Sequence, residues 1–337
     1  MAFTVSDVVL PFDTLKRITR YWPSSESCQR IEPVTTGATN QIYRLSEPET
    51  FYLRRFKTGE PQKIIREHAL VANLSEQALP VVLPLCTTDN RTWVEEIGSF
   101  FALYPEARGE IVSQLSLSHA RAAGEALARL HLGLVGYRQD GFPAIPLRWS
   151  QSSWVARLQV IIDRLQSQAN PTDTERWALI RAKQQQQFLA SDCSIHHYQP
   201  VSKPQLIHGD YHQYNIFFDA NREVSAVIDW DLVCCMPVGY EIARACMYMF
   251  QLDAGHCAEF VRGYIKWSPL TNETLDDGAK AWGIYADHHV WALEAVYLHG
   301  NTAAKKFIPH REFVPFMQRW RAMLEHTGLR NDVANHV

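Results

Sequence analysis

The sequence predicts an α+β fold with two lobes, a small antiparallel-sheet lobe followed by a large, mainly helical lobe. Three observations support this prediction. The chain has 337 residues, which is too long for one compact core. About the first hundred residues alternate apolar and polar side chains in short runs, which is typical of strands. After Gly109 the apolar residues follow the spacing of helices.

The segment 105–109 is the expected linker between the lobes, because it combines proline, charged residues and glycine. It separates an N-terminal lobe at residues 1–104 from a C-terminal lobe at residues 110–337. In the first lobe a helix is expected from Pro61, since proline is favoured at the first helical position. Strands are expected at 41–45 and 50–56, which form a hairpin around Pro48 and Glu49, and at 81–85, 92–97 and 99–104.

The second lobe is predicted to be helical with one insert of strands. Helices are expected from Ser118, over 154–168 and 172–190, and from Gly239 to about His326. The insert comprises short strand patterns at 205–207, 215–218 and 224–229. The polar residues that could carry chemistry are concentrated in this insert.

Composition excludes several classes of protein. The net charge of −3 gives no basic field for binding nucleic acid. No apolar run reaches the roughly 20 residues that span a membrane, and no signal peptide is expected. The seven cysteines are odd in number and none forms a C-x-x-C pair, so we expect a reducing, cytoplasmic environment. Neither pair of adjacent histidines has the spacing of a zinc site.

The insert carries an H-x-D-x-x-x-x-N loop followed by an apolar-apolar-Asp sequence. Asp210 and Asn215 lie five residues apart, and a short hairpin can return Asp229 to the same place. Phosphoryl transfer needs one carboxylate to orient the attacking hydroxyl, and an amide oxygen and a second carboxylate to hold Mg²⁺. The alternative is a plain turn, in which the Asp and Asn side chains bond to their own backbone. The flanking strands favour the catalytic interpretation.

The run Leu206–Asp231 resembles the catalytic core of the aminoglycoside phosphotransferase and choline kinase family, which has an H-G-D-x-x-x-x-N loop followed by I-D-W or a close variant. The resemblance extends from about Ile31 to Ala304. It implies a protein-kinase-like bilobal fold and transfer of the γ-phosphoryl group of ATP, or GTP, to a hydroxyl of a small molecule. By this resemblance Asp210 is the catalytic base, His208 is a structural member of its loop, and Asn215 and Asp229 hold Mg²⁺.

The first lobe contains matching features. Residues 36–40, with Gly37 and Asn40, resemble the family's phosphate-covering loop, although an ordinary turn has the same composition. Arg54 stands where the phosphate-binding lysine is commonest, and Arg55 or Lys57 could share that task. Glu67 resembles the helical glutamate that orients this cation, with a solvated helix charge as the alternative.

Residues 103–109 resemble the hinge that receives the adenine ring. Backbone groups near Pro105 and Ala107 would bond the edge of the base. Because such contacts use the backbone, they leave little trace in the sequence.

Four functions remain open at this point. A kinase with a small-molecule substrate is favoured over a protein Ser/Thr kinase, because no Ala-Pro-Glu follows Asp229. A non-catalytic nucleotide-binding regulator is the second alternative, although Asp210, Asn215 and Asp229 are all present. The third alternative is a metal-dependent hydrolase that uses His208, Asp210, His212 and Asp229.

The acceptor is expected to carry positive charge. Between Asp229 and Gly300 the chain has ten acidic and four basic residues, together with several aromatic ones. Aromatic faces and carboxylates both attract ammonium groups. The alternative is that the aromatic residues form core and the acidic residues face water. The candidate acceptor-binding residues are Asp231, Trp282, Asp287, Trp291 and Glu294.

Overall fold

The computed structural model describes residues 9–34, 40–57, 59–309 and 312–336. The chain forms two compact units, and each unit is assembled from segments that are far apart in the sequence. Unit 1 comprises Met1–Gln114, Leu132–Gly141 and His212–Val233, and unit 2 comprises Leu115–His131, Phe142–Tyr211 and Cys234–Val337.

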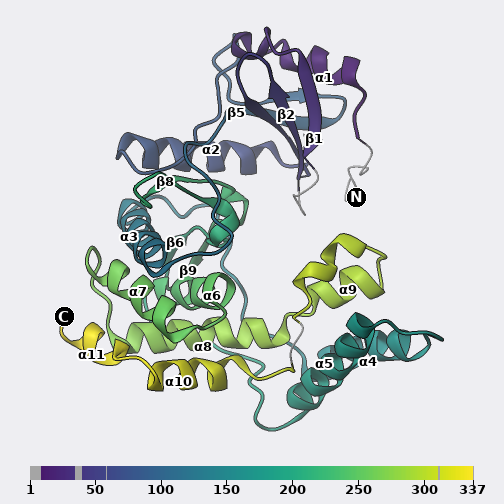
Figure 1. The fold of residues 1–337 in the computed structure, drawn as a ribbon, viewed down its shortest axis with the longest axis vertical. Helices are drawn as coiled ribbons and strands as arrows, with labels where there is room; N and C mark the ends of the chain where they lie inside the picture. The colour runs from purple at the N-terminus through teal and green to yellow at the C-terminus, as the bar shows by residue number, and fades with distance from the viewer. Residues whose placement is uncertain (1–8, 35–39, 58, 310–311, 337) are drawn as a thin grey trace. The chain divides into compact units, whose positions relative to one another are not determined.

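Unit 1 contains a five-stranded antiparallel sheet in the order β1-β2-β3-β5-β4 (Figure 1). The expected β2–β3 hairpin is confirmed, with Ile42 opposite Arg54. The expected helix from Pro61 is confirmed as well. The bounds are α1 Phe12–Thr19, β1 Arg30–Val34, β2 Gln41–Ser46, β3 Phe51–Phe56, α2 Pro61–Glu76, β4 Val94–Glu96 and β5 Ser99–Pro105.

The two faces of this sheet are covered by different helices. Leu15 and Ile18 of α1 belong to the same apolar cluster as Leu53 of β3. Ile64 of α2 belongs to a separate cluster with Phe56. Because side chains alternate along a strand, Arg54 shares the face of Phe56, and its guanidinium lies 4.8 Å from the centre of the Phe56 ring. The alternation of β3 therefore directs Arg54 toward the α2 side.

A second, short hairpin in unit 1 joins β7 Ile216–Phe218 to β8 Val224–Val227. It places Asn215 beside Ile228, whose N–H donates to the Asn215 carbonyl over 3.0 Å. The strand expected at 81–85 is wrong. Val81 makes one isolated bridge with Val227, and Pro84 lacks the N–H that a ladder requires.

Unit 2 is mainly helical, as expected for the second lobe, and the α+β class is confirmed (Figure 1). It also holds a two-stranded sheet of β6 and β9, of which only β6 was expected. Residues of unit 2 form β6 Gln205–Ile207, β9 Cys234–Met236, most of α3 Leu117–Gly133, α4 Gln151–Gln166, α5 Asp173–Ala190, α6 Val238–Phe250, α7 Ala254–Ile265, α8 Asn272–His288, α9 Trp291–Tyr297, α10 Phe316–Glu325 and α11 Leu329–Ala334.

Local sequence explains where several of these helices lie. Thr172 and Glu175 form a capping box that begins α5. Helices α6 and α8 cross at Gly239 and Gly278, where a Cβ atom on Gly278 would lie 2.1 Å from the Gly239 carbonyl carbon. Close backbone contact therefore requires glycine at this crossing.

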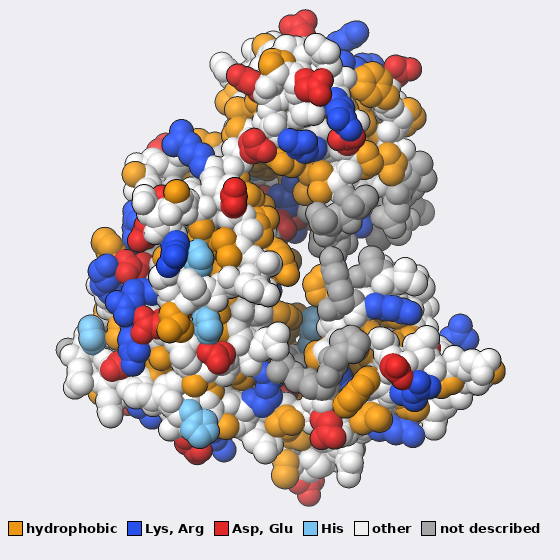
Figure 2. Space-filling view, in the orientation of Figure 1, with side chains coloured by type: hydrophobic (Ala, Val, Ile, Leu, Met, Phe, Trp, Pro, Cys, Tyr) orange, Lys and Arg blue, Asp and Glu red, His pale blue; other side chains and the backbone are white. Residues whose placement is uncertain are grey.

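On the face shown in Figure 2, acidic and basic side chains are interspersed, so no field of one sign dominates that face. None of the helices within the described residues combines the length and the apolar character needed to cross a membrane.

Candidate active site

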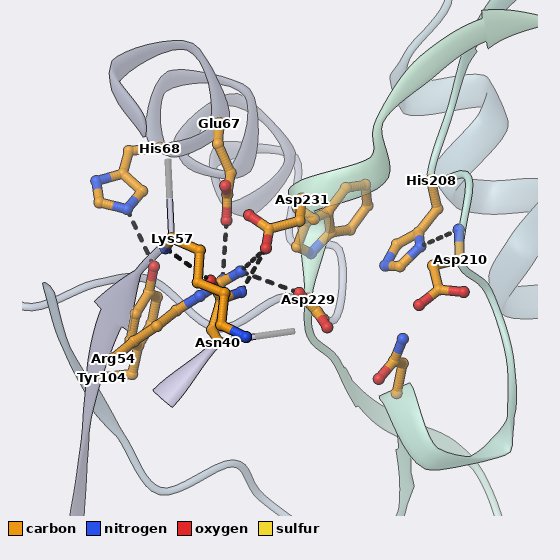
Figure 3. Close-up of polar contacts among 12 residues, drawn as sticks. Asn40, Arg54, Lys57, Glu67, His68, Tyr104, His208, Asp210, Asp229 and Asp231 are labelled. Atoms are coloured by element: carbon orange, nitrogen blue, oxygen red, sulfur yellow. Dashed lines mark hydrogen bonds and ion pairs between the residues drawn. The ribbon is translucent and has the colours of Figure 1, made fainter. Parts of the chain in front are cut away.

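Arg54 is the centre of a cluster of charges in unit 1 (Figure 3). Its Nη1 lies 3.2 Å from Oε1 of Glu67, and its Nη2 lies 3.1 Å from Oδ1 of Asp229. The same Nη2 pairs with Oδ2 of Asp231. Asn40 donates its side-chain amide to Asp231, and its side-chain oxygen accepts from the Lys57 N–H over 3.2 Å. Strand β3, helix α2 and the chain after β8 thus converge on one guanidinium.

The cluster has more negative than positive charge. One arginine faces three carboxylates, and the Arg54 and Glu67 side chains are both more than nine-tenths buried. Burial raises the pKa of Glu67 above its ordinary value, and the Asp231 and Asp229 carboxylates add to this although Arg54 opposes it. Burial alone would also raise the pKa of Asp231, but Arg54 and two hydrogen bonds lower it overall. The cluster is therefore ready to receive a proton or a metal cation.

Asn215 and Asp229 are brought together by the β7–β8 hairpin of unit 1. Asn215 is buried, with its side-chain nitrogen 3.4 Å from Nε2 of His212. Asp229 has φ 64° and ψ 68°, in the left-handed region that residues other than glycine seldom adopt. Such backbone strain persists where the surroundings fix it and is frequent at functional residues.

Asp210 follows β6 in unit 2, in a loop that buried groups hold in place. The Asp210 N–H donates to Nδ1 of His208 over 3.1 Å. Glu241 of α6 is fully buried and accepts from the backbone N–H of His208 and of Gly209, and it also contacts Nε2 of His131 at 2.9 Å. Gly209 has φ 81°, which favours glycine. Glu241 therefore anchors the loop that carries Asp210.

Arg244, one turn further along α6, pairs with the Asp210 carboxylate. Its guanidinium also donates to the Tyr211 carbonyl over 3.3 Å and lies 4.7 Å from the centre of the Tyr248 ring. An arginine beside a carboxylate favours the charged form of that carboxylate, which is the form that accepts a proton.

The remaining nucleotide-binding candidates lie in different surroundings. Gly37 lies outside the described residues, and Asn40 takes part in the cluster around Arg54. Pro105 is the last residue of β5, opposite Phe51 of β3, and Ala107 follows in the loop after it.

The candidate acceptor residues do not form one group of free charges. Asp231 pairs with Arg54, and Glu294 pairs with Arg157. Asp287 is buried, and its Oδ1 accepts from the Phe316 N–H over 2.9 Å. Trp282 is buried in the core, with its ring 5.3 Å from that of Tyr240. Trp291 is exposed at 41% and lines a cavity of unit 2.

Sequence reasoning missed Glu241, Arg244 and Arg157 as members of the site. A signal for the first two was present, since they are charged residues in the otherwise apolar stretch Val238–Phe250. Their partners lie more than thirty residues away, so no local spacing could have identified them.

Within the described part of the chain, no three His, Cys, Asp or Glu side chains are grouped so as to hold a metal ion. This finding gives no support to the hydrolase interpretation, which needs such a cluster. A kinase makes a smaller demand, because Mg²⁺ is commonly held by one or two carboxylates and by the substrate phosphates.

Comparison with known proteins places this geometry in a family. The chain matches the model of the phosphotransferase enzyme family over residues 30–275. No curated protein matches it. It resembles an aminoglycoside phosphotransferase from Alicyclobacillus acidocaldarius, with a TM-score of 0.62, 13% identity, and coverage of 99% of this chain and 100% of the other.

Two ligand complexes have the same fold. A spectinomycin phosphotransferase bound to ADP and spectinomycin gives a TM-score of 0.62 at 12% identity and covers 97% of this chain and 98% of its own. An amicoumacin kinase bound to AMP-PNP and Ca²⁺ gives a TM-score of 0.54 at 14% identity, and the match covers 90% of this chain and 95% of the kinase. The protein-kinase-like fold of the aminoglycoside phosphotransferases is thereby confirmed, and the chain belongs to the phosphotransferase enzyme family.

Proposed function

We propose that this phosphotransferase moves the γ-phosphoryl group of ATP, or of GTP, to a hydroxyl of a small molecule, with Asp210 as the base. The observation that carries the proposal is the cluster in which Arg54 faces Glu67, Asp229 and Asp231. A buried arginine fixed by a helical glutamate is suited to phosphate oxygens, which its planar fork binds in pairs.

The donor set in unit 1 fits a magnesium nucleotide. The pKa of Glu67 is raised to about 8, but the Asp229 and Asp231 carboxylates still outnumber the single guanidinium, so a divalent cation meets a surplus of negative charge. Asn215 and Asp229 offer an amide oxygen and a carboxylate, which are hard ligands of the kind Mg²⁺ prefers. When bound, Mg²⁺ neutralises charge on the phosphate oxygens.

Asp210 in unit 2 has the surroundings that a base requires. Its side chain is 20% exposed, so an acceptor hydroxyl can approach it. Arg244 pairs with the carboxylate, and His208 accepts from the backbone N–H of Asp210. Asp210 accepts the proton of the acceptor hydroxyl as the hydroxyl oxygen attacks the γ-phosphorus. The bond from the γ-phosphorus to the β-phosphate oxygen breaks and ADP, or GDP, leaves, while Arg54, oriented by Glu67, binds the phosphates.

The spectinomycin, aminoglycoside and amicoumacin enzymes show which kinds of molecule relatives of this fold phosphorylate. We take the acceptor here to be a small hydroxyl compound of comparable kind. A positive charge on the acceptor does not follow from Asp231 and Glu294, because both carboxylates already pair with arginines.

The test is nucleotide turnover across a panel of amino alcohols, sugars and aminoglycosides, with Asp210→Ala and Asp210→Asn as variants. Both variants should bind nucleotide normally and lose about a thousandfold or more of the turnover rate, because base and orientation are removed together. Asp192→Ala is the control, since Asp192 is an exposed residue of unit 2.

Near-normal turnover by Asp210→Ala on an accepted substrate would refute the proposal. Nucleotide binding by the wild type without turnover of any alcohol would instead favour the regulatory alternative. Competition between ATP and GTP in the same assay identifies the preferred nucleotide.

A further inference from the structure

A cavity of about 200 Å³ lies in unit 2, beside α4, α8 and α9. Four aromatic side chains contribute to its walls: Trp149, Trp154, Tyr285 and Trp291. Rings of this kind present flat apolar faces with polar edges, and they bind the flat faces of ligands well. A chamber of this size holds one small ring.

The imidazoles in the wall are kept neutral. His288 stacks on Trp149, with ring centres 4.3 Å apart and planes 11° from parallel. Its Nδ1 donates to the Ile284 carbonyl over 2.8 Å, so its Nε2 accepts from Nδ1 of His196 at 2.9 Å. Desolvation and His196 lower the pKa of His288 to about 4. Partial desolvation and the nearby positive charge of Arg244 also lower the pKa of His289.

The charged residues of the wall neutralise each other. Arg157 pairs with both carboxylate oxygens of Glu294, with Nη2 2.6 Å from Oε2. The Arg157 guanidinium also lies 4.6 Å from the centre of the Trp154 ring, so a protein cation already occupies that aromatic face. A ligand ammonium group in this cavity would therefore meet a guanidinium and a carboxylate that is already paired.

A chain of contacts within unit 2 connects the cavity to Asp210. The Arg244 guanidinium, which pairs with Asp210, lies 5.7 Å from the centre of the Trp282 ring. Trp282 in turn stacks on Tyr285, with ring centres 5.5 Å apart, and Tyr285 lines the cavity. The cavity is thus connected to the residue that we propose as the base through Tyr285, Trp282 and Arg244.

We infer that this cavity is the acceptor subsite, and that it takes the flat face of a neutral, ring-bearing hydroxyl compound such as a sugar in preference to a cation. The inference rests on the proposed function. The apolar C–H face of such a ring stacks on the indoles and on Tyr285, while Arg157 and Glu294 offer a donor and an acceptor to its hydroxyls.

The primary test uses wild-type protein without nucleotide and two pairs of probes that differ in charge. N-acetylglucosamine is compared with protonated glucosamine, and cyclohexanol with piperidin-4-ol, by saturation-transfer NMR and titration. The neutral member of each pair should bind on the order of tenfold more tightly. Equal or tighter binding of the cationic members, or no binding of either neutral probe, overturns the inference.

Two variants locate the binding. Trp291→Ala should weaken binding of N-acetylglucosamine about threefold to tenfold, the loss expected for one stacking partner. Trp177→Ala is the matched control, because Trp177 is exposed at 39% against 41% for Trp291 and does not line the cavity. Equal effects of the two substitutions would contradict the assignment.

Arg157→Met removes the partner of Glu294 and should shift preference toward glucosamine on the order of tenfold.

Failure of the inference and failure of the proposed function give different results. If alcohols are phosphorylated but the neutral probes do not bind, only the subsite is wrong. If the neutral probes bind as expected but no alcohol in the panel is phosphorylated, the subsite stands and the proposed function fails.

Discussion

At the scale of single residues, Arg54 differs from the lysine that is commonest at its position in the resembling family. A lysine offers one point charge, whereas the Arg54 guanidinium contacts Glu67 through Nη1 and both Asp229 and Asp231 through Nη2. Burial alone would lower the pKa of Arg54, but the carboxylates of Glu67, Asp231 and Asp229 raise it overall and hold Arg54 in the charged form. Arg54 therefore organises the cluster, and we propose that it also offers its charge to a phosphate.

We predict that Arg54→Ala lowers kcat/KM for ATP by about a hundredfold, the loss typical of one charge-stabilising group in an active site. Arg54→Lys should recover part of this loss, because the charge returns without the planar fork. Lys57→Ala is the matched control and should change kcat/KM little. A larger loss in Lys57→Ala than in Arg54→Ala, measured by steady-state kinetics, would move the phosphate-binding role to Lys57.

At the scale of elements, the sequence predicted structure best where a periodic pattern coincided with a local signal. The β2–β3 hairpin and α2 have both, with Pro48 in the turn and Pro61 at the helix start. Strands β1 and β9 were missed because β1 contains Pro33 and charged residues, and β9 has three residues. These two segments become strands because they pair with other strands, and a short stretch of sequence does not show which strand it will pair with.

The candidate site shows the same contrast between features that local sequence predicts and features that depend on tertiary contacts. The loop with Asp210 and Asn215 and the hairpin to Asp229 are local, and the sequence identified them. Glu241 and Arg244 act on this loop across long sequence distances, so their positions depend on tertiary packing. From the surplus of acidic residues we predicted acidic groups that would attract a cationic acceptor. In the folded protein, however, Asp231 and Glu294 each form an ion pair with an arginine.

Asp287 links two elements of unit 2, since this residue of α8 accepts from the N–H of Phe316 at the start of α10. Burial raises the pKa of Asp287 to about 7, although the Phe316 N–H and the charges of Arg181 and Arg319 oppose the shift. The folded protein therefore holds this proton more tightly than the unfolded chain, whose Asp pKa is about 3.9. Stability from this group is full below about pH 4 and is lost as the pH rises toward 7.

We predict that Asp287→Asn removes this loss, because the amide oxygen keeps the bond to Phe316 without a charge to bury. The variant should be more stable than wild type by about 4 kcal/mol at pH 8 but by only about 1 kcal/mol at pH 4.5. Urea unfolding at the two pH values measures the difference. The same ΔΔG at both pH values, or destabilisation confined to pH 8, would contradict the shifted pKa.

At the scale of the whole molecule, the proposed tasks divide between the two units. Arg54, Glu67, Asn215 and Asp229, the proposed nucleotide and metal residues, all belong to unit 1. Asp210 and the aromatic cavity belong to unit 2. The chain leaves each unit and returns to it, so residues 212–233 complete unit 1 although they follow a long segment of unit 2. No composition shift in the sequence marks such returns.

The assignment of the proposed nucleotide residues to unit 1 predicts which segments a bound nucleotide protects from hydrogen exchange. A ligand that binds only the folded state stabilises it by about 2.7 kcal/mol at a hundred times its Kd, and this slows amide exchange that requires opening of the bound region. ATP with Mg²⁺ should therefore slow hydrogen exchange about a hundredfold in β3, α2 and the β7–β8 hairpin of unit 1, and leave the α4–α5 hairpin of unit 2 unchanged. EDTA or Asp229→Ala should abolish most of this protection, whereas Asp192→Ala should keep it. Mass-spectrometric hydrogen exchange decides the question. Protection that survives EDTA would contradict the metal assignment, and protection confined to α4 and α5 would contradict the location of the nucleotide site.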